Sequence, residues 1–322
     1  MLQSSPPILI IRLDGIGDAL ALTPLLAALR ARGIPADLVL QRSNAGIFSS
    51  RAARRIEIVP FDLRSSTPTN IERIRTFGQQ IGVCGYSHAL VATEDPGGYR
   101  LARWSGAPAR VGFTNGWGKP LKTLWVRSQL TQTVYRPAGH DSRGRHECEV
   151  LFELGRSLLG TEQPTHSCEQ LRPLLLDEDP LRDQRVAVQI TNKWQRLGVR
   201  VDEVADMLQR LASIVQLRLI GSKAESEYGD AIAAAVRRPI EYFGEVNTWK
   251  VAVATARALV APDSGATHVA GIAGTPTVAI FPVQPNFEQQ VARWRPWAAP
   301  YRIVKLEEGW QRRTVAALVE LM

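Results

Sequence analysis

The sequence lacks several features that would narrow its function at once. No apolar run approaches the about 20 residues that a membrane-spanning helix requires, and the longest, such as residues 277–281, have the length of a strand. We expect no signal peptide, because the N-terminus has no charged segment followed by a long apolar one. The three cysteines, Cys84, Cys148 and Cys168, are odd in number and widely spaced. This usage is typical of reduced thiols in a cytoplasmic protein, and not of a disulfide framework or a zinc site.

The sequence also lacks dense blocks of basic residues, although its net charge is +8 from 39 Lys and Arg against 31 Asp and Glu. A basic balance favours an anionic partner, such as nucleic acid, anionic lipid headgroups or a phosphorylated substrate. The arginines are scattered, and no helix-turn-helix, zinc-finger or RNA-recognition signature accompanies them. We therefore expect no nucleic-acid partner.

Strand-length apolar runs alternate with longer helical patterns along the 322 residues, which predicts βαβ units and parallel sheets. The pattern repeats in two halves of similar size. We expect one α/β domain over 1–165 and a second over 175–322, with 161–184 as linker, a cleft between them and a last helix that packs back on the first domain. Expected strands lie near 8–13, 37–41, 56–60, 88–93, 109–113, 185–190, 216–220, 240–242, 257–261 and 276–281. Expected helices lie near 18–32, 44–53, 69–81, 96–105, 143–160, 202–214, 223–237, 246–255, 265–274 and 307–322, and residues 114–141 read as a long loop.

The most informative segment is residues 8–18, in which an apolar strand runs into a glycine-bearing turn and the carboxylate of Asp18. In an open α/β sheet, ligands bind beyond the carboxyl ends of the strands. Gly15 and Gly17 let the chain turn sharply and leave room for a substrate. A third glycine is missing, and Asp14 and Asp18 would repel a phosphate, so the turn is not a dinucleotide fingerprint. These carboxylates suit a general base better, although capping of the next helix explains Asp18 equally well when it is taken alone.

A second constellation lies in residues 256–281, which predict a strand, a short turn and a helix. Asp263, Ser264 and Gly265 form the turn, and the amides at the helix N-terminus are suited to binding a diphosphate. His268 falls about one turn into that helix. The alternative is that Asp263 or Ser264 only caps the helix and that His268 belongs to the core.

A weaker third segment follows the first strand of the second half. Thr191 and Asn192 are candidate hydrogen-bond donors, and Lys193 is a candidate partner for a phosphate. Glu225 follows the next strand, where a carboxylate can bind ribose hydroxyls. Taken alone, the Lys193-Trp194 pair is more often a surface feature than a site, and a glutamate such as Glu225 is common in the first turn of a helix.

Together these segments resemble glycosyltransferase family 9, the heptosyltransferases of lipopolysaccharide core assembly. The Ile-Arg-x-x-x-x-Gly-Asp turn that ends at Asp18, the Lys193-Trp194 pair and the Asp-Ser-Gly-x-x-His-x-Ala-x-x-x-Gly-Thr-Pro run from Asp263 match the family in order and spacing. A weaker match is Arg145-His146-Glu147 at the start of a helix. Asp14 departs from the pattern, because family members often carry a small or hydroxyl residue there.

The resemblance implies an α/β fold of the GT-B type, with two facing Rossmann-like domains. It implies that Asp18 is the general base for an acceptor hydroxyl and that transfer inverts the anomeric configuration. No cofactor or metal is needed if Lys193 and the amides of Ser264 and Gly265 stabilise the leaving diphosphate. The nearby Asp14 leaves the choice of base open. The implied donor site comprises Thr191, Asn192, Lys193, Glu225, Asp263, Ser264, Gly265 and His268, and the candidate acceptor side comprises Asp14, Gly17, Arg136, His140 and His146.

The resemblance further implies an ADP-heptose-like donor and an anionic lipid-linked or envelope glycan acceptor. The expected location is the cytoplasm, with peripheral contact between the basic surface and the inner membrane. Two alternatives stay open. One is a GT-B enzyme with another nucleotide-sugar and a protein or glycan acceptor, and the other is a non-catalytic member that binds nucleotide. The presence of both Asp18 and His268 favours an enzyme.

Overall fold

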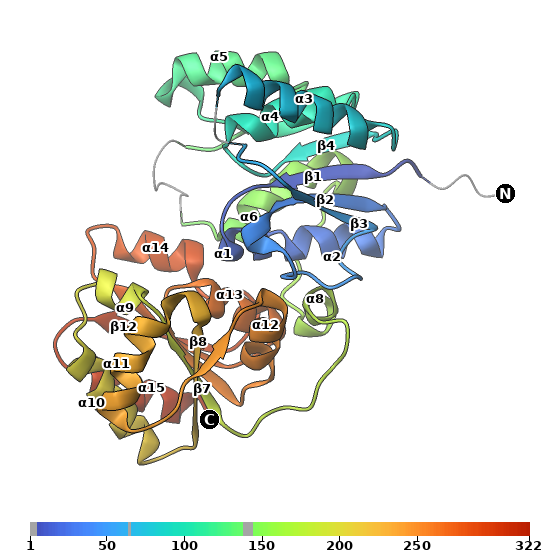
Figure 1. Ribbon diagram of the computed structural model, residues 1–322. Coiled ribbons are helices and arrows are strands. Elements are labelled where there is room, and N and C mark those ends of the chain that lie inside the picture. Colours follow the sequence, from blue (N-terminus) through green and yellow to red (C-terminus); the bar gives the residue numbers. More distant parts are fainter. Residues whose placement is uncertain (1–4, 64–65, 138–143) are drawn as a thin grey trace. The chain divides into compact units, whose positions relative to one another are not determined.

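The computed structural model describes residues 5–63, 66–137 and 144–322 and divides the chain into two compact units, Met1–Thr165 and His166–Met322. Each unit is a six-stranded parallel sheet with helices on both faces (Figure 1). This confirms the predicted α/β class with parallel sheets. Among the described residues, no helix is both long and apolar enough to span a bilayer.

The N-terminal sheet has the strand order β3-β2-β1-β4-β5-β6. Its strands are β1 (Ile8–Arg12), β2 (Ala36–Gln41), β3 (Arg55–Val59), β4 (His88–Val91), β5 (Ala109–Thr114) and β6 (Gln132–Tyr135). Helices α3 (Pro68–Gly82), α4 (Pro96–Trp104) and α5 (Pro120–Gln129) cover one face, and α1 (Ile16–Leu20), α2 (Thr23–Ala31) and α6 (Glu147–Phe152) lie on the other, followed by α7 (Arg156–Leu159) (Figure 1). Every residue of β1 is buried, as its apolar sequence and its central place between β2 and β4 require.

The C-terminal sheet has the order β12-β11-β10-β7-β8-β9. Its strands are β7 (Val186–Ile190), β8 (Leu217–Ser222), β9 (Glu241–Phe243), β10 (Ala258–Pro262), β11 (Thr277–Pro282) and β12 (Tyr301–Leu306). When each unit's strands are numbered from one, both sheets have the Rossmann order 3-2-1-4-5-6, in which ligands bind where the order reverses. That point lies between β1 and β4 in the first sheet and between β7 and β10 in the second.

Helices of the C-terminal unit pack on both faces of its sheet. Helices α10 (Val201–Ala212), α11 (Ser226–Val236) and α15 (Trp310–Leu321) pack together, as do α8 (Cys168–Leu175), α12 (Val246–Thr255) and α13 (Gly265–Ala273). Two further helices are α9 (Lys193–Arg196) and α14 (Phe287–Trp294). Trp194 is fully buried and stacks on Trp310, with ring centroids 5.5 Å apart. The last helix contacts α10, β11 and β12 of its own unit.

Three local predictions need correction. The expected loop over 114–141 contains α5 and β6 in its described part, because the glycines before the helix and Pro120 at its first position interrupt the periodicity. The expected helix over 44–53 is absent beyond a 3-10 turn at Arg42–Asn44, since Gly46 has a left-handed φ of 79°. The expected helix over 143–160 breaks at a 3-10 turn, Glu153–Gly155, and its first residue lies outside the described part. The segment 161–184 carries α8, which packs on α13.

Candidate functional site

The carboxyl end of β1 carries a buried arginine that holds the predicted base. Arg12 is the last residue of β1 and only 2% exposed. Its Nη2 donates a 2.8 Å hydrogen bond to Oδ1 of Asp18, which follows the Gly15 turn in α1 and is about one-third exposed. The Nη1 of Arg12 donates to the backbone oxygen of Ala92, just after β4. Asp18 is therefore fixed at the point where the strand order reverses, with one face open to solvent.

Asp14 lies beside the same arginine. Its Oδ2 is 3.5 Å from Nη1 of Arg12, and its backbone oxygen accepts a 2.6 Å hydrogen bond from Asn44. Both carboxylates predicted at this turn thus contact one guanidinium, but only Asp18 forms a short hydrogen bond with it. The backbone oxygen of Gly17 accepts a hydrogen bond from the backbone NH of Ala21, so Gly17 contributes to the local backbone structure after β1.

Behind Arg12, charged side chains continue as one network. Glu147 is fully buried, with Oε1 3.7 Å from Nη2 of Arg12 and both carboxylate oxygens 3.1 Å from Nη2 of Arg136. Arg136 also lies 3.6 Å from Glu94, which in turn pairs with Lys122. Burial raises the pKa of Glu94, but the Lys122 ammonium and Arg136 outweigh it, and the pKa lies below its usual value. The predicted acceptor-side residue Arg136 is thus part of this network.

Of the two histidines predicted for the acceptor side, the structure describes only His146. His146 is buried and caps α6, because its Nδ1 accepts the backbone NH of Cys148 and its own NH donates to Glu149. This cap places Glu147 in the first turn of α6, against Arg12 and Arg136. His140 lies outside the described residues.

In the C-terminal unit, Lys193 and Asp263 meet at the corresponding point of the second sheet. Lys193 opens α9 directly after β7, and its Nζ donates to the backbone oxygen of Asp263 and lies 3.4 Å from Oδ2. Asp263 follows β10. Thr191 is nearly buried and accepts the backbone NH of Lys193, which sets the turn. Both Lys193 and Asp263 are about one-quarter exposed, so the pair is accessible to a ligand.

Beside this pair, two buried polar atoms have no hydrogen-bond partner among the residues that the structure describes. They are Oγ of Ser264, which precedes α13, and Oδ1 of Asn192, which precedes α9. Ser264 is extended and does not cap its helix with its side chain, so the backbone amides at Gly265 begin α13 without that acceptor. A helix N-terminus of this kind attracts anions. His268, one turn inside α13, lies edge-on to Trp294 at 5.5 Å between ring centroids.

Glu225 lies in a hollow of about 710 Å³ beyond β7 and β8. The same hollow is lined by Asn192, Tyr228 and Arg200. The structure thus brings two predicted donor-side residues, Asn192 and Glu225, to one cavity next to Lys193. Among the residues that the structure describes, no group of three His, Cys, Asp or Glu side chains is arranged to hold a metal ion.

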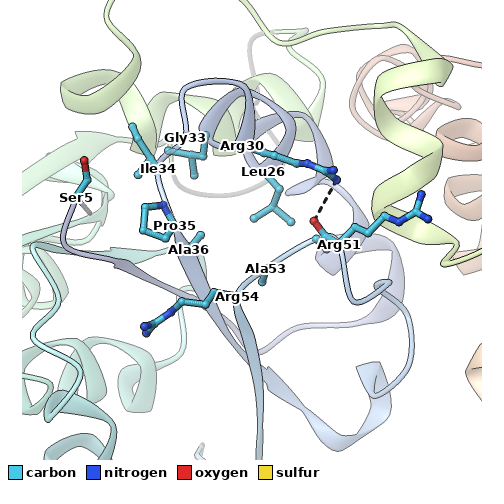
Figure 2. A pocket seen from close by; sticks show the side chains of 12 residues that line it. Ser5, Leu26, Arg30, Gly33, Ile34, Pro35, Ala36, Arg51, Ala53 and Arg54 are labelled. Atoms are coloured by element: carbon cyan, nitrogen blue, oxygen red, sulfur yellow. Dashed lines mark hydrogen bonds between the residues drawn. The ribbon is translucent and has the colours of Figure 1, made fainter. Parts of the chain in front are cut away.

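A further hollow, of about 550 Å³, lies at the opposite edge of the N-terminal sheet (Figure 2). It is lined by Leu26 and Arg30 of α2, by Ala36 at the start of β2, and by Arg51. Nη1 of Arg30 donates a 3.3 Å hydrogen bond to the backbone oxygen of Arg51. Because Asp18 follows the carboxyl end of β1, this hollow takes no part in the site.

The sequence patterns predicted no role for four residues of this network: Arg12, Glu94, Lys122 and Glu147. Arg12 and Glu147 nevertheless lie within motifs that resemble the family. Arg12 could have been noticed as a charged residue at the end of an otherwise apolar strand. Glu147 could have been noticed as an acid directly after the residue that caps α6. Only the fold shows that all four side chains lie in one network.

Comparison with known proteins shows which fold class and which family the chain is similar to. Two sheets of this topology, each with polar groups at its switch point, have the architecture of GT-B glycosyltransferases, as predicted. Residues 197–318 match the model of glycosyltransferase family 9 (heptosyltransferase). The resemblance predicted from the sequence is therefore confirmed. No curated protein sequence matches the chain.

Several solved structures share the fold over nearly the whole chain. The Escherichia coli heptosyltransferase WaaC with ADP has 16% identity and a TM-score of 0.75, covering 98% of this chain and 100% of its own. A family 9 glycosyl transferase from Veillonella parvula has 15% identity and a TM-score of 0.73, with 100% and 98% covered. The Escherichia coli ADP-heptose lipopolysaccharide heptosyltransferase II has 17% identity and a TM-score of 0.69, with 98% of each chain covered. At 15–17% identity, these structural similarities establish the fold alone.

Proposed function

We propose that this protein is an inverting, metal-independent glycosyltransferase. It transfers a sugar, heptose in the leading case, from a nucleoside-diphosphate donor such as ADP-heptose to a lipopolysaccharide-core or other cell-envelope acceptor. One observation carries the proposal: the two sheets place an oriented carboxylate, Asp18, and an accessible lysine, Lys193, at their respective switch points. Solved relatives of the same fold are described with ADP and with ADP-2-deoxy-2-fluoro heptose, which supports an ADP-sugar donor.

In this reaction, Asp18 accepts the proton of an acceptor hydroxyl while the hydroxyl oxygen bonds to the anomeric carbon. The bond between that carbon and the diphosphate oxygen breaks, and the leaving nucleoside diphosphate keeps the electron pair. Arg12 holds the Asp18 carboxylate in one orientation. Lys193 and the amides at the start of α13 stabilise the negative charge that develops on the diphosphate.

The donor side is assigned to the C-terminal unit. Ser264 and Asn192 each have a buried side-chain oxygen available to a ligand, and Glu225 opens α11 at the neighbouring hollow, in reach of ribose hydroxyls. Thr191 and Asp263 position Lys193, and His268 lies on the first turn of α13. The acceptor side is assigned to the N-terminal unit, where Asp14 shares Arg12 with Asp18, Gly17 precedes Asp18, and Arg136 joins the same network through Glu147. The protein works in the cytoplasm, at the inner face of the membrane.

The first experiment is thermal unfolding with ADP, UDP, GDP and CMP at matched concentrations. A ligand that binds only the folded protein stabilises it by about 2.7 kcal/mol at a hundredfold excess over its Kd. We expect selective stabilisation by ADP. A preference for UDP or GDP supports the alternative donor class, and ADP binding without any sugar transfer supports the non-catalytic alternative.

Two substitutions locate the nucleotide. Lys193→Gln and Ser264→Ala should each reduce stabilisation by ADP, and Lys223→Gln, an exposed lysine of the same unit, should leave it unchanged. Loss of a hydrogen bond from Ser264 predicts an about threefold to tenfold weaker Kd, because a net hydrogen bond contributes about 1 kcal/mol. Since Oγ of Ser264 has no partner, the stability of the ligand-free protein should not fall. An unchanged ADP response in both variants would refute this donor site.

A further inference from the structure

Helix α5 presents an apolar outer surface that is exposed in the described part of the chain. Trp117, in the 3-10 turn before the helix, is 95% exposed, and Leu121 and Leu124 on the helix are 84% and 71% exposed. Leu121 and Leu124 are three residues apart and so share one side of the helix, and Trp117 lines the same hollow as these two leucines. With Lys119 and Arg127 they form what we call the α5 patch.

The inner side of α5 already provides the contacts that hold it to its unit. Thr123 and Val126 are buried, and Trp125 packs edge-on against Tyr99 of α4 at 5.9 Å between ring centroids. The outer leucines and Trp117 instead line an open hollow of about 460 Å³. Burial of the helix therefore does not explain three large apolar side chains on its outer side, and such groupings mark interaction surfaces.

The segment that carries the patch has charges of one sign. Residues 115–131 contain Lys119, Lys122 and Arg127 and no Asp or Glu. Lys122 pairs with Glu94, whereas within the described part of the chain no ion pair is recorded for Lys119 or Arg127. A helix with apolar residues and tryptophan on its outer side and cations beside them is typical of segments that lie in the interface of an anionic bilayer.

We propose that the α5 patch docks the protein on an anionic lipid bilayer. Trp117, Leu121 and Leu124 enter the boundary between headgroups and acyl chains. Lys119 and Arg127 lie against the lipid phosphates. Charge complementarity selects a bilayer over a second copy of this basic chain, which would bring like charges together.

The position of the patch adds a functional reason, which rests on the proposed function. The 3-10 turn with Trp117 follows the carboxyl end of β5, the same edge of the sheet at which Asp18 follows β1. Asn115, next to this turn, donates a hydrogen bond to the backbone oxygen of Arg136, and Lys122 joins the ion-pair network that leads to Arg12. A lipid-linked acceptor held in the bilayer is thereby presented at the edge that carries the base.

The test is flotation of the full chain with vesicles of phosphatidylcholine and phosphatidylglycerol at 3:1, against phosphatidylcholine alone. We expect binding to the anionic vesicles that weakens as salt rises. Lys119→Glu with Arg127→Glu should lower the partition coefficient at least about twentyfold, since each cation near the surface contributes about fivefold. Leu121→Ser with Leu124→Ser should lower it about tenfold through lost apolar burial.

Matched controls separate the patch from general charge and hydrophobicity. Arg238→Glu with Arg312→Glu gives the same change in net charge at exposed sites elsewhere. Val83→Ser with Leu181→Ser removes two other highly exposed apolar side chains. Both control variants should float like the parent protein.

The inference is overturned if the patch variants float as well as their controls, or if the parent binds neither vesicle at low salt. A change of oligomeric mass in the leucine variant, without loss of flotation, overturns it in favour of contact between copies. Stabilisation by ADP, measured on the same variants, should be unchanged. Failure of the ADP response in the parent therefore bears on the proposed function and not on the patch.

Discussion

The switch points of the two sheets occupy the same place in the same topology and carry different kinds of polar group. At the N-terminal switch point, Arg12 and Asp18 lie at the end of a network that continues through Glu147 and Arg136. At the C-terminal switch point, Lys193 and Asp263 form one accessible pair beside Oγ of Ser264, which has no partner. The first edge joins its charges in a buried network, in which Nε of Arg12 and Oδ2 of Asp14 still have no hydrogen-bond partner among the described residues, and the second edge carries a smaller and more accessible pair.

In the proposed function, this difference lets one architecture support two roles. A carboxylate that takes a proton needs a fixed orientation, and buried arginine and glutamate side chains behind Asp18 provide it. A site for a diphosphate needs exposed positive charge and free amide donors, as at Lys193 and the start of α13. The topology sets the location of both edges, while the residues that follow the strands set their chemistry.

The largest effect that the comparison predicts is on Asp18. Asp18→Asn should lower the rate of sugar transfer by about 10²–10⁴-fold, the usual contribution of a general base, while stabilisation by ADP stays intact. The measurement is steady-state kinetics together with thermal unfolding in ADP. An unchanged rate would remove Asp18 from the mechanism.

Asp14→Asn is the matched control for that substitution. Asp14 contacts the same guanidinium at 3.5 Å, compared with 2.8 Å for Asp18, so we expect a much smaller loss of rate. If Asp14→Asn loses the larger share, Asp14 is the base and Asp18 its neighbour.

The next effect concerns the stability of the N-terminal network. Glu147→Gln removes a buried carboxylate that faces Arg12 and Arg136, and should lower the free energy of unfolding by about 3 kcal/mol. Urea unfolding measures this loss. Glu241→Gln serves as the control, because Glu241 pairs with Arg218 while it is about half exposed, and the expected loss is below about 1 kcal/mol. Equal losses in the two variants would contradict the idea that the first edge depends on buried charge pairs.

The smallest effect concerns a buried cation in the C-terminal unit, Lys250 of α12. Burial lowers its pKa from 10.5 to about 8. Between these values the unfolded chain binds more protons than the folded protein, so the destabilisation by Lys250 is complete below pH 8 and is relieved as pH rises from 8 towards 10.5. The stability of the parent relative to Lys250→Met should therefore increase by about 1 kcal/mol from pH 8 to pH 9.

Denaturant unfolding of both proteins at the two pH values tests this expectation. Lys223→Met, at an exposed position, gives the baseline for loss of a lysine. A difference between parent and Lys250→Met that stays flat or falls with pH would show that Lys250 is not held in a desolvated site.

Local periodicity was sufficient for much of the fold. The helix expected over 246–255 is α12 as observed, and the buried strands β1, β7 and β10 lie within a residue or two of their apolar runs. Prediction failed where local signals conflicted. Around Trp117, glycines and Pro120 mask the start of α5, and its apolar outer residues blur the period that marks a helix.

By itself, the sequence determined the alternating α/β pattern, the Asp18 turn and the Asp263–His268 run, because these depend on neighbours in the chain. The tertiary structure alone decided that Arg12 holds Asp18 against Glu147, and that Lys193 meets Asp263 across 70 positions. It also decided that His146 caps a helix and that, among the described residues, Trp117, Leu121 and Leu124 beside and on α5 are exposed. The physical reason is that ion pairing and burial depend on which strand ends the sheet order brings together, and that order involves contacts between residues far apart in sequence.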